Sequence, residues 1–322
     1  MKKLFTVTLI LALVLSVFAG CGPEGHPVRY RIAIVQQMDH SSMDEIRTAI
    51  EAELDAKAAE MGIKLEYKVF NGQNDATVLN QIGAQVVSDG YDIIIPIATL
   101  AAQCMVTAAE GTEIPVVFAA VSDPEGAGLT GMDTVTGTSD ALNPAFILDM
   151  MRTAQPGVKT VGLLYSNSEP NSAKPIEQAR EYLEANNIAY LEKTGNTTDE
   201  VISAASSLVG RVDAVFTPTD NVVMGAEAAV AEILNEAGIP HYTGADSFVL
   251  SGAFATCGVN YTELGTKTAD MALDVLRSGA VPGFHTMDGG IITVNTDTAK
   301  AVNVDYSAFS DMANTINEVT SE

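Results

Sequence analysis

The sequence predicts an α/β protein with two lobes, each built on a doubly wound parallel sheet. Strand and helix patterns alternate along most of the chain, and some strands, such as residues 32–35, are apolar throughout. Such strands are typical of a parallel sheet that helices cover on both faces. The alternation starts again after residue 143, and 322 residues are enough for two domains. Two lobes of similar construction are therefore expected.

The chain starts with the pattern of an exported lipoprotein. Two lysines follow Met1, residues 4–18 are uncharged and mostly apolar, and two small residues precede Cys21. This is the order of a signal peptide, and its apolar run is shorter than the ~20 residues of a membrane span. We expect residues 1–20 to be removed, Cys21 to carry a lipid, and residues 21–29 to be a tether. The protein would then be extracytoplasmic and anchored to the cell membrane. An ordinary signal peptide or an N-terminal membrane helix is the alternative.

The first half predicts four strands with helices between them. Ser42-Met43-Asp44-Glu45 has the pattern of a capping box, and the helix that follows repeats its apolar residues close to the 3.6 period. Gly62 is expected to end that helix. The expected strands are residues 31–35, 64–70, 91–96 and 114–118, and the expected helices are 42–61, 77–89 and 99–110.

The second half repeats this alternation. Asn143-Pro144 predicts a helix start, with Asn as the cap and Pro at the first helical position. The elements after residue 250 are too few for a third domain and should extend the two lobes. The expected strands are residues 160–165, 188–191, 212–216, 239–242, 252–257 and 291–294, and the expected helices are 175–186, 199–209, 221–237 and 263–276.

Charge and cysteine content exclude some partners. The formal net charge is −24, which argues against nucleic acid and against an anionic membrane surface, since both favour Lys and Arg. Besides Cys21, the chain has Cys104 in an expected helix and Cys257 in an expected strand. We expect two buried thiols, with a disulfide between them as the alternative.

The residues that directly follow the strands are the candidates for ligand binding, because open parallel sheets bind ligands beyond the carboxyl ends of their strands. They are rich in Asp, Asn, Gln, Ser and Thr and poor in basic residues. This inventory suits a small neutral or zwitterionic solute. The helix start at Thr99 offers N–H groups to a carboxylate, and Asp220 or Asp246 can hold an ammonium group. The alternative is that such residues are only helix caps.

No enzyme signature is found in the sequence. It contains no GxSxG, GxxxxGK[ST], HExxH or CxxC motif, and its four histidines lack metal-ligand spacing. Only His40 falls at an expected ligand position. We therefore expect a binding protein without catalysis, cofactor or metal.

Several stretches together resemble a known family. They are residues 91–103, 114–124, 212–221 and 252–256, followed by Tyr261-Thr262-Glu263-Leu264-Gly265. From about residue 30 to 305 the chain resembles bacterial ABC-transporter substrate-binding proteins of the tryptophan/tyrosine-binding (TrpX-like) group. The resemblance implies a type I periplasmic-binding-protein fold, with three crossovers near Thr138, Gly258 and Thr286. One lobe would hold residues 30–137 and 259–285, and the other would hold 138–258 and 286–322.

The resemblance also implies a function. A monomeric receptor would clamp an aromatic amino acid between its lobes and deliver it to an ABC permease. Residues 165–172 differ from the Tyr-Asn-Pro-rich loop of many relatives, which leaves open the side chain of the ligand. The alternatives are a nucleoside or peptide receptor of the same fold and an extracytoplasmic sensor. The ligand-binding residues implied are Gln36, Thr99, Asp123, Asn171, Ser172, Asp220, Asn221 and Asp246.

Overall fold

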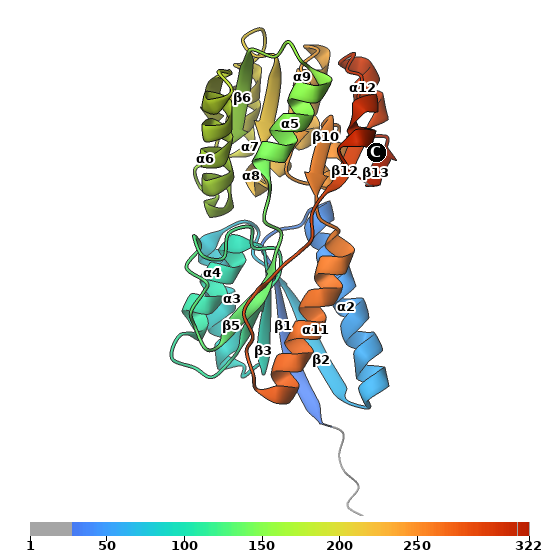
Figure 1. Cartoon of the computed structure of the whole chain (residues 1–322). Helices are drawn as coiled ribbons and strands as arrows, with labels where there is room; N and C mark the ends of the chain where they lie inside the picture. The colour runs from blue at the N-terminus through green and yellow to red at the C-terminus, as the bar shows by residue number, and fades with distance from the viewer. Residues whose placement is uncertain (1–27, 314, 322) are drawn as a thin grey trace, which may run out of the picture.

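The computed structural model describes residues 28–313 and 315–321. The expected signal peptide, Cys21 and the tether up to residue 27 lie outside the described residues. Within the described part, the chain forms two α/β lobes joined end to end, each around one sheet (Figure 1). The predicted architecture of two doubly wound lobes is confirmed. No helix in this part of the chain has the length and apolar character needed to cross a membrane.

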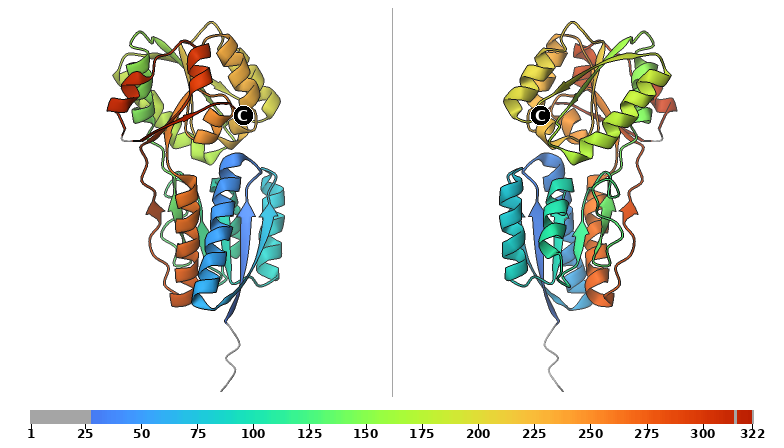
Figure 2. Two further views of the ribbon diagram at one scale, coloured as in Figure 1. Left: turned by 90° about the vertical axis from the view of Figure 1, so that its right-hand side faces the viewer. Right: turned by 90° about the vertical axis from the view of Figure 1, so that its left-hand side faces the viewer.

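The N-terminal lobe contains a parallel sheet in the order β11-β5-β4-β3-β1-β2. Helices α2 (Ser41–Met61) and α11 (Tyr261–Ser278) pack on one face, and α3 (Ala76–Ser88) and α4 (Thr99–Ala109) pack on the other (Figure 2). Successive residues of β1 point to these two faces, which explains why residues 32–35 of this strand are all apolar. The strands are β1 (Arg29–Gln36), β2 (Lys64–Asn71), β3 (Ile93–Ile97), β4 (Val116–Phe118), β5 (Val135–Ser139) and β11 (His285–Thr286).

The C-terminal lobe contains a mixed sheet in the order β13-β12-β10-β9-β8-β6-β7, in which β12 runs antiparallel to β10. Its strands are β6 (Thr160–Tyr165), β7 (Ala189–Thr194), β8 (Ala214–Thr217), β9 (His241–Thr243), β10 (Ala255–Gly258), β12 (Ile291–Asn295) and β13 (Thr315–Val319). Its helices are α5 (Pro144–Ala154), α6 (Pro170–Ala185), α7 (Thr198–Ser206), α8 (Asn221–Met224), α9 (Glu227–Glu236), α10 (Asp246–Leu250), α12 (Thr296–Ala301) and the 3₁₀ turn η1 (Ser307–Asp311).

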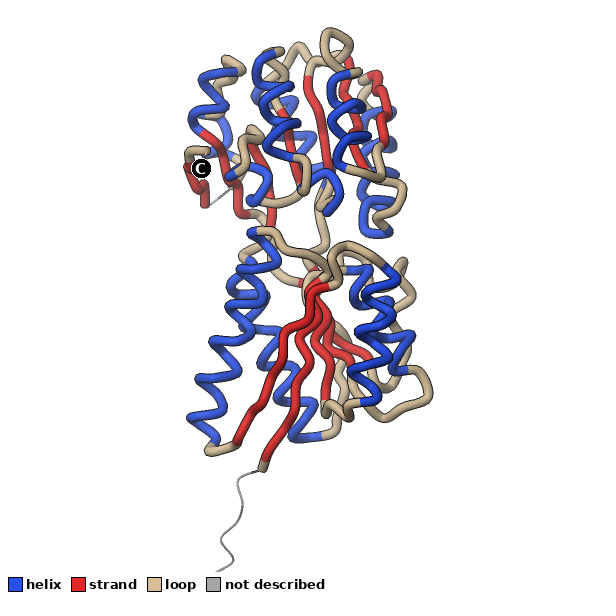
Figure 3. The backbone as a smooth tube through the Cα atoms, turned by 180° about the vertical axis from the view of Figure 1, so that it is seen from behind, coloured by secondary structure: helices blue, strands red, loops and turns tan. Residues whose placement is uncertain are grey.

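The two lobes share one strand order. In the first it is β2-β1-β3-β4-β5, and in the second it is β7-β6-β8-β9-β10. In each lobe the order reverses beside the first strand, and ligands of such sheets bind at this switch point, beyond the carboxyl ends of the strands. The chain passes between the lobes after β5, after β10 and after β11 (Figures 1 and 3). The three predicted crossovers are therefore present.

Three of the predicted helices differ from those observed. The prediction of a capping box at Ser42 was wrong. Helix α2 begins one residue earlier, at Ser41, so His40 occupies the N-cap position. Helix α6 begins at Pro170 rather than at Pro175, because Pro170 already supplies the favourable first position and Pro175 falls inside the helix. The expected helix 221–237 is two helices, α8 and α9, separated at Gly225.

Other local predictions are confirmed. The Asn143 side chain caps α5 by accepting a hydrogen bond from the Phe146 N–H at 3.1 Å. Cys104 and Cys257 are both buried free thiols. One apolar cluster includes β1 and α2 of the first lobe and also α7, α8 and α10 of the second. The two lobes are therefore in contact in this structure.

Candidate ligand-binding site between the lobes

A cavity lies between the lobes, at the carboxyl ends of both sheets. Ligands of such sheets bind at this place. Both lobes contribute to its wall. The lining residues are His40, Ser42, Met43, Ile46, Ile97, Ala98, Thr99, Ala120, Ser122, Asp140, Asn171, Thr219, Asn221, Met224, Ala245, Ser247, Phe248 and Tyr261.

Large apolar side chains form one part of the wall. Met43 and Ile46 come from the first turns of α2, and Tyr261 from the start of α11. Met224 at the end of α8 and Phe248 in α10 come from the other lobe. Thioether groups and rings adapt well to a flat aromatic group. This part of the cavity can therefore hold an aromatic or bulky apolar side chain.

A carboxylate forms the centre of the polar part. Asp140 accepts hydrogen bonds from the hydroxyls of Ser122 at 2.9 Å and Tyr261 at 3.3 Å. Ser122 also lies 3.2 Å from the hydroxyl of Thr219, which belongs to the opposite lobe. Burial raises the pKa of Asp140, because the charged form has lost its water. A cationic group of a ligand would restore the charged form, so the site suits an ammonium.

Two helix starts supply positive potential to the same cavity. His40 and Ser42 lie at the start of α2, and Ala98 and Thr99 lie at the start of α4. In the described part of the chain, neither His40, the N-cap of α2, nor Ala98, the N-cap of α4, caps its helix with a side-chain hydrogen bond. Among the described lining residues there is no Lys or Arg. Helix N–H groups and hydroxyls, rather than a basic side chain, are therefore what the wall offers to a carboxylate.

Several polar atoms of the wall are left for a ligand. A buried polar atom without a hydrogen bond destabilises the fold by about 1–3 kcal/mol, so a group of them at one place indicates a binding site. In the described part of the chain, the buried side-chain atoms of the cavity wall that lack a partner are His40 Nδ1, Ser42 Oγ, Asn171 Oδ1 and Ser247 Oγ.

The backbone is strained at two places in the wall. Ala98 has a φ of 76° and Ala120 a φ of 54°, both in the left-handed region that non-glycine residues rarely adopt. Ala98 directly follows the central strand β3, and Ala120 lies two residues after the end of β4. Strain of this kind often marks functional sites, because the surrounding structure must hold it in place.

Three of the predicted ligand residues line the cavity: Thr99, Asn171 and Asn221. Asn171 donates a hydrogen bond to the Thr219 carbonyl, which leaves its own oxygen free for a ligand. Asn221 bonds to His40 of the opposite lobe at 3.2 Å. The structure therefore brings together predicted residues from both lobes.

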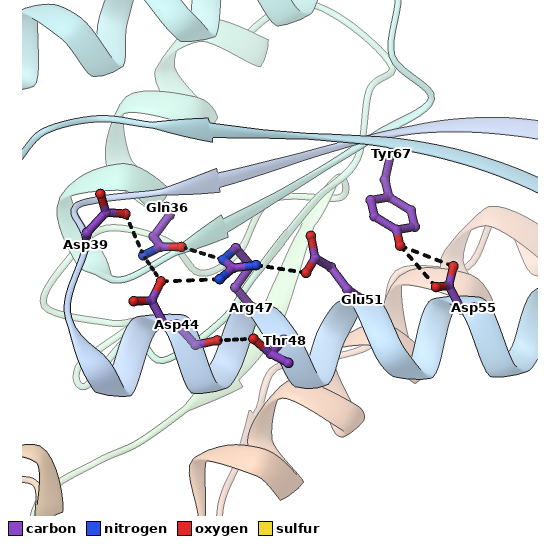
Figure 4. Close-up of polar contacts among 8 residues, drawn as sticks. All are labelled: Gln36, Asp39, Asp44, Arg47, Thr48, Glu51, Asp55 and Tyr67. Carbon is purple, nitrogen blue, oxygen red and sulfur yellow. Dashed lines mark hydrogen bonds and ion pairs between the residues drawn. The ribbon is translucent and has the colours of Figure 1, made fainter.

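Gln36 lies outside the cavity wall, in a polar network at the end of β1 (Figure 4). Its Nε2 donates to the Met38 carbonyl at 2.7 Å and to Asp44 Oδ1 at 3.0 Å, and its Oε1 accepts from Arg47 Nε at 3.1 Å. These bonds fix the loop that leads into α2. The next residue, Gln37, points toward the other lobe instead.

The other predicted residues also lie beside the cavity rather than in its wall. Asp123 pairs with Lys174, Ser172 donates to Asp220 at 2.7 Å, and Asp220 caps α8. Asp246 lines a neighbouring polar cavity with Glu45. There, burial and the Glu45 charge raise the pKa of Asp246 to about 6.

Sequence reasoning missed much of the wall. Ser42 was assigned to a helix cap, and Asp140 directly follows β5, a strand that the sequence analysis did not predict. Met224, Phe248 and Tyr261 look like ordinary apolar helix residues in sequence. The available signal was a position shortly after a strand. It holds for His40, the only histidine at an expected ligand position, and also for Ser122, Thr219 and Ser247, which line the wall.

Two similar lobes that meet over a cavity of this kind define a ligand-binding protein of the type I periplasmic-binding class. The family model described as ABC transporter substrate binding protein matches residues 31–311. The chain belongs to this family. Substrate-binding proteins of ABC importers work outside the cytoplasm.

Individual relatives are similar over nearly the whole chain. A tyrosine-binding protein of Clostridioides difficile is 32% identical over 94% of this chain and 93% of its own length. A Streptococcus pneumonia structure in complex with L-Trp has a TM-score of 0.82 at 28% identity, over 89% of this chain and 99% of that one. The ligand-free, open structure of a Clostridium difficile substrate-binding protein with adhesive properties has a TM-score of 0.69 at 32% identity, over 91% and 100%.

Proposed function

We propose that this protein is the receptor of an ABC importer for an aromatic amino acid, which it holds between its two lobes. The observation that carries the proposal is the interlobe cavity, in which unpaired polar atoms face an apolar wall of Met, Phe and Tyr side chains. The ligands of two relatives, tyrosine and tryptophan, support the same class of solute. We assign it no catalytic chemistry and expect it to act as a monomer beside permease subunits.

The proposed ligand has a defined orientation. Its ammonium lies against Asp140, and its carboxylate lies near the starts of α2 and α4, where Ser42 and Thr99 are available. Its ring lies between Met43 and Phe248. This arrangement uses both lobes, so the ligand stabilises their contact.

The arrangement of the lobes supports a closed, ligand-competent form. The TM-score is higher with the L-Trp complex (0.82) than with the open, ligand-free structure (0.69), although the open structure has the higher sequence identity. A difference in lobe orientation, rather than in the fold of each lobe, accounts for such a reversal. We infer that the described lobes lie near the closed position.

The lipid on Cys21 is part of this proposal. Strand β1 starts at the end of its lobe that faces away from the other lobe (Figure 1). A tether attached there holds the protein at the membrane while the cavity stays at the opposite end of that lobe. Cys21→Ser is expected to release the protein from the membrane fraction and to leave ligand binding unchanged, whereas loss of binding would contradict this separation of anchor and receptor.

A thermal-shift screen of the twenty amino acids tests the ligand class. A ligand that binds only the folded state raises the melting temperature. We expect a rise with Trp, Tyr or Phe and none with Asp, Lys or Gly. A rise with nucleosides or short peptides alone would replace the aromatic amino acid by those solutes.

A further inference from the structure

The side chain of Glu169 connects the two lobes behind the cavity wall. Glu169 precedes α6 and is 4% exposed. Its Oε1 accepts from Gln37 Nε2 of the first lobe at 3.1 Å, and its Oε2 accepts from Asn221 Nδ2 at 2.7 Å. Asn221 in turn bonds to His40 Nε2, back in the first lobe, at 3.2 Å. These contacts therefore run from Gln37 through Glu169 and Asn221 to His40 and cross the interface between the lobes twice. Asn221 and His40 both line the cavity.

The orientation of the Gln37 amide is fixed. Its Oε1 accepts the Leu100 N–H at 3.1 Å, so its Nε2 must be the donor. The two hydrogens of that Nε2 go to Asn74 Oδ1 at 2.7 Å and to Glu169 Oε1. Glu169 Oε1 is therefore always an acceptor, and a proton on this carboxyl group can only be on Oε2.

The Asn221 amide has two possible orientations, and the Glu169 proton selects between them. When Glu169 is ionised, Asn221 donates to Oε2 and accepts from His40 Nε2–H, so His40 Nδ1 carries a lone pair. When Oε2 is protonated, it donates to the Asn221 oxygen. The amide nitrogen then donates to His40 Nε2, and the ring proton moves to Nδ1. The bond at one ring nitrogen thus sets the role of the other.

The surroundings of Glu169 favour the protonated state. Burial and the charge of Asp220 raise the pKa of Glu169 to about 8. Asp220 remains the better site for the negative charge, because it accepts bonds from the Ser166 N–H, the Ser172 hydroxyl and the Val223 N–H. The two cations of α6 are engaged elsewhere, since Lys174 pairs with Asp123 and Arg180 pairs with Glu192.

His40 stays neutral in the same surroundings. Burial lowers the pKa of His40, and this effect exceeds the opposing effects of the bond to Asn221 and of the charges of Asp44 and Asp39. A neutral imidazole has one N–H, so its position matters for any ligand that meets Nδ1.

We propose that Glu169 is a positioning residue that takes up a proton when the lobes close and, through Asn221, sets His40 to present an Nδ1–H donor to an oxygen of the ligand. This inference rests on the proposed function and adds its regulation by pH. With the lobes apart, the bond to Gln37 is broken, water reaches Glu169, and its pKa returns toward about 4.3. At neutral pH, closure on the ligand therefore binds a proton.

The sign of the pH dependence follows. Because the closed state holds the extra proton, ligand affinity falls as pH rises toward 8, by up to about tenfold per pH unit, and levels off above the pKa of the closed state. Asp140, the carboxylate of the cavity itself, acts in the opposite direction, since it must be ionised to hold an ammonium, so a decline in affinity with rising pH does not come from Asp140. The alkaline limb of the profile therefore reports on Glu169.

Calorimetric titration of L-tyrosine and L-tryptophan into the purified protein tests the proposal. Titration in buffers of different ionisation enthalpy should show uptake of close to one proton per ligand near neutral pH, and the alkaline decline in affinity described above. Saturable binding without proton uptake, or an affinity that does not decline between about pH 6 and 8, would contradict the role of Glu169 while leaving the proposed ligand intact. Absence of binding by any aromatic amino acid would contradict the proposed function instead, and proton uptake is then measured with the solute that the screen identifies.

The Glu169→Gln variant provides a matched test. Its oxygen faces Gln37, and its amide N–H faces the Asn221 oxygen, as in the protonated acid. We expect affinity close to that of wild type in acid and tighter binding than wild type at neutral pH, because the variant does not have to take up a proton. It should show no proton uptake and no alkaline decline. Glu177→Gln, at an exposed position of the same helix, should keep the wild-type profile. A Glu169→Gln profile equal to that of wild type would refute the proposal.

The histidine tautomer gives a readout that needs no variant. In the complex, ¹⁵N spectra of histidine-labelled protein should show His40 protonated at Nδ1. Protonation at Nε2 would overturn the relay through Asn221.

Discussion

The ammonium of Lys174 lies 2.8 Å from Oδ1 of Asp123, and this ion pair joins the two lobes beside the cavity. Lys174 belongs to α6 of the second lobe, and Asp123 follows β4 of the first. The pair forms only when the lobes are together, so it should stabilise the closed state. Its Lys side chain is 51% exposed, which limits its contribution to about 0.2–1 kcal/mol.

Lys174→Met should therefore weaken ligand binding by about two- to fivefold, mainly through faster release. Because salt screens an exposed pair, the difference from wild type should shrink at high ionic strength. Stopped-flow and equilibrium titration at low and high salt measure both effects. Lys300→Met is the control, since Lys300 pairs with Asp297 inside one lobe. An equal effect of the two variants would show that the interlobe position of Lys174 does not matter.

Asp140→Asn should lower the affinity for an aromatic amino acid by roughly ten- to a hundredfold. It removes the charged partner of the ammonium, and a hydrogen bond to a charged group contributes about 1.5–3 kcal/mol. The measurement is a titration with the amino acid and with its analogue that lacks the ammonium. Wild type should discriminate strongly between the two ligands and the variant weakly. Equal discrimination by both proteins would place the ammonium elsewhere.

Asp246→Asn should stabilise the protein at neutral pH and not in acid. Burial and Glu45 raise the pKa of Asp246 from 3.8 to about 6 in the fold. The folded state therefore binds the proton of Asp246 more tightly than the unfolded state does. Ionisation of Asp246 lowers the free energy of unfolding as pH rises from about 4 to 6, and the full loss is present above that range. We expect a gain of about 1–2 kcal/mol in the free energy of unfolding at about pH 7.5 and none at about pH 4. Asp297→Asn, an exposed acid in the first turn of α12, should give no such gain.

Glu227→Ala should strongly destabilise the second lobe. Glu227 Oε1 lies 3.0 Å from His241 Nδ1, and both side chains are fully buried. Removing Glu227 leaves the buried ring nitrogen of His241 without its hydrogen-bond partner, which costs about 1–3 kcal/mol. Glu192→Ala removes the partner of Arg180 at a partly exposed site and should cost about 1 kcal/mol or less. Thermal unfolding of the two variants compares them, and similar losses would contradict the role of burial.

Much of the fold could be predicted because it depends on local patterns. Strands that are apolar on both faces, such as 31–35, indicate a covered parallel sheet, and the restart at Asn143 indicates a second lobe. Helix starts were less predictable. The Ser42 pattern fitted a capping box, yet the helix begins one residue earlier and the Ser42 hydroxyl is left for a ligand.

The site was predictable only in part, because its wall depends on how two lobes are oriented. Thr99, Asn171 and Asn221 follow strand ends closely enough to be found. Asp220 follows a strand equally well, but local backbone N–H groups engage its carboxylate as a cap. Phe248 and Asp140 meet across the cavity only because the crossovers set the lobe positions, which no residue pattern encodes.

Equilibrium titration of L-tyrosine into the purified protein, with L-tryptophan and L-phenylalanine alongside, tests the central claim most directly. We expect saturable binding of at least one of them at a single site per chain, with much weaker binding of the analogue that lacks the ammonium. No binding of any of the three by folded protein would contradict the assignment of the cavity to an aromatic amino acid.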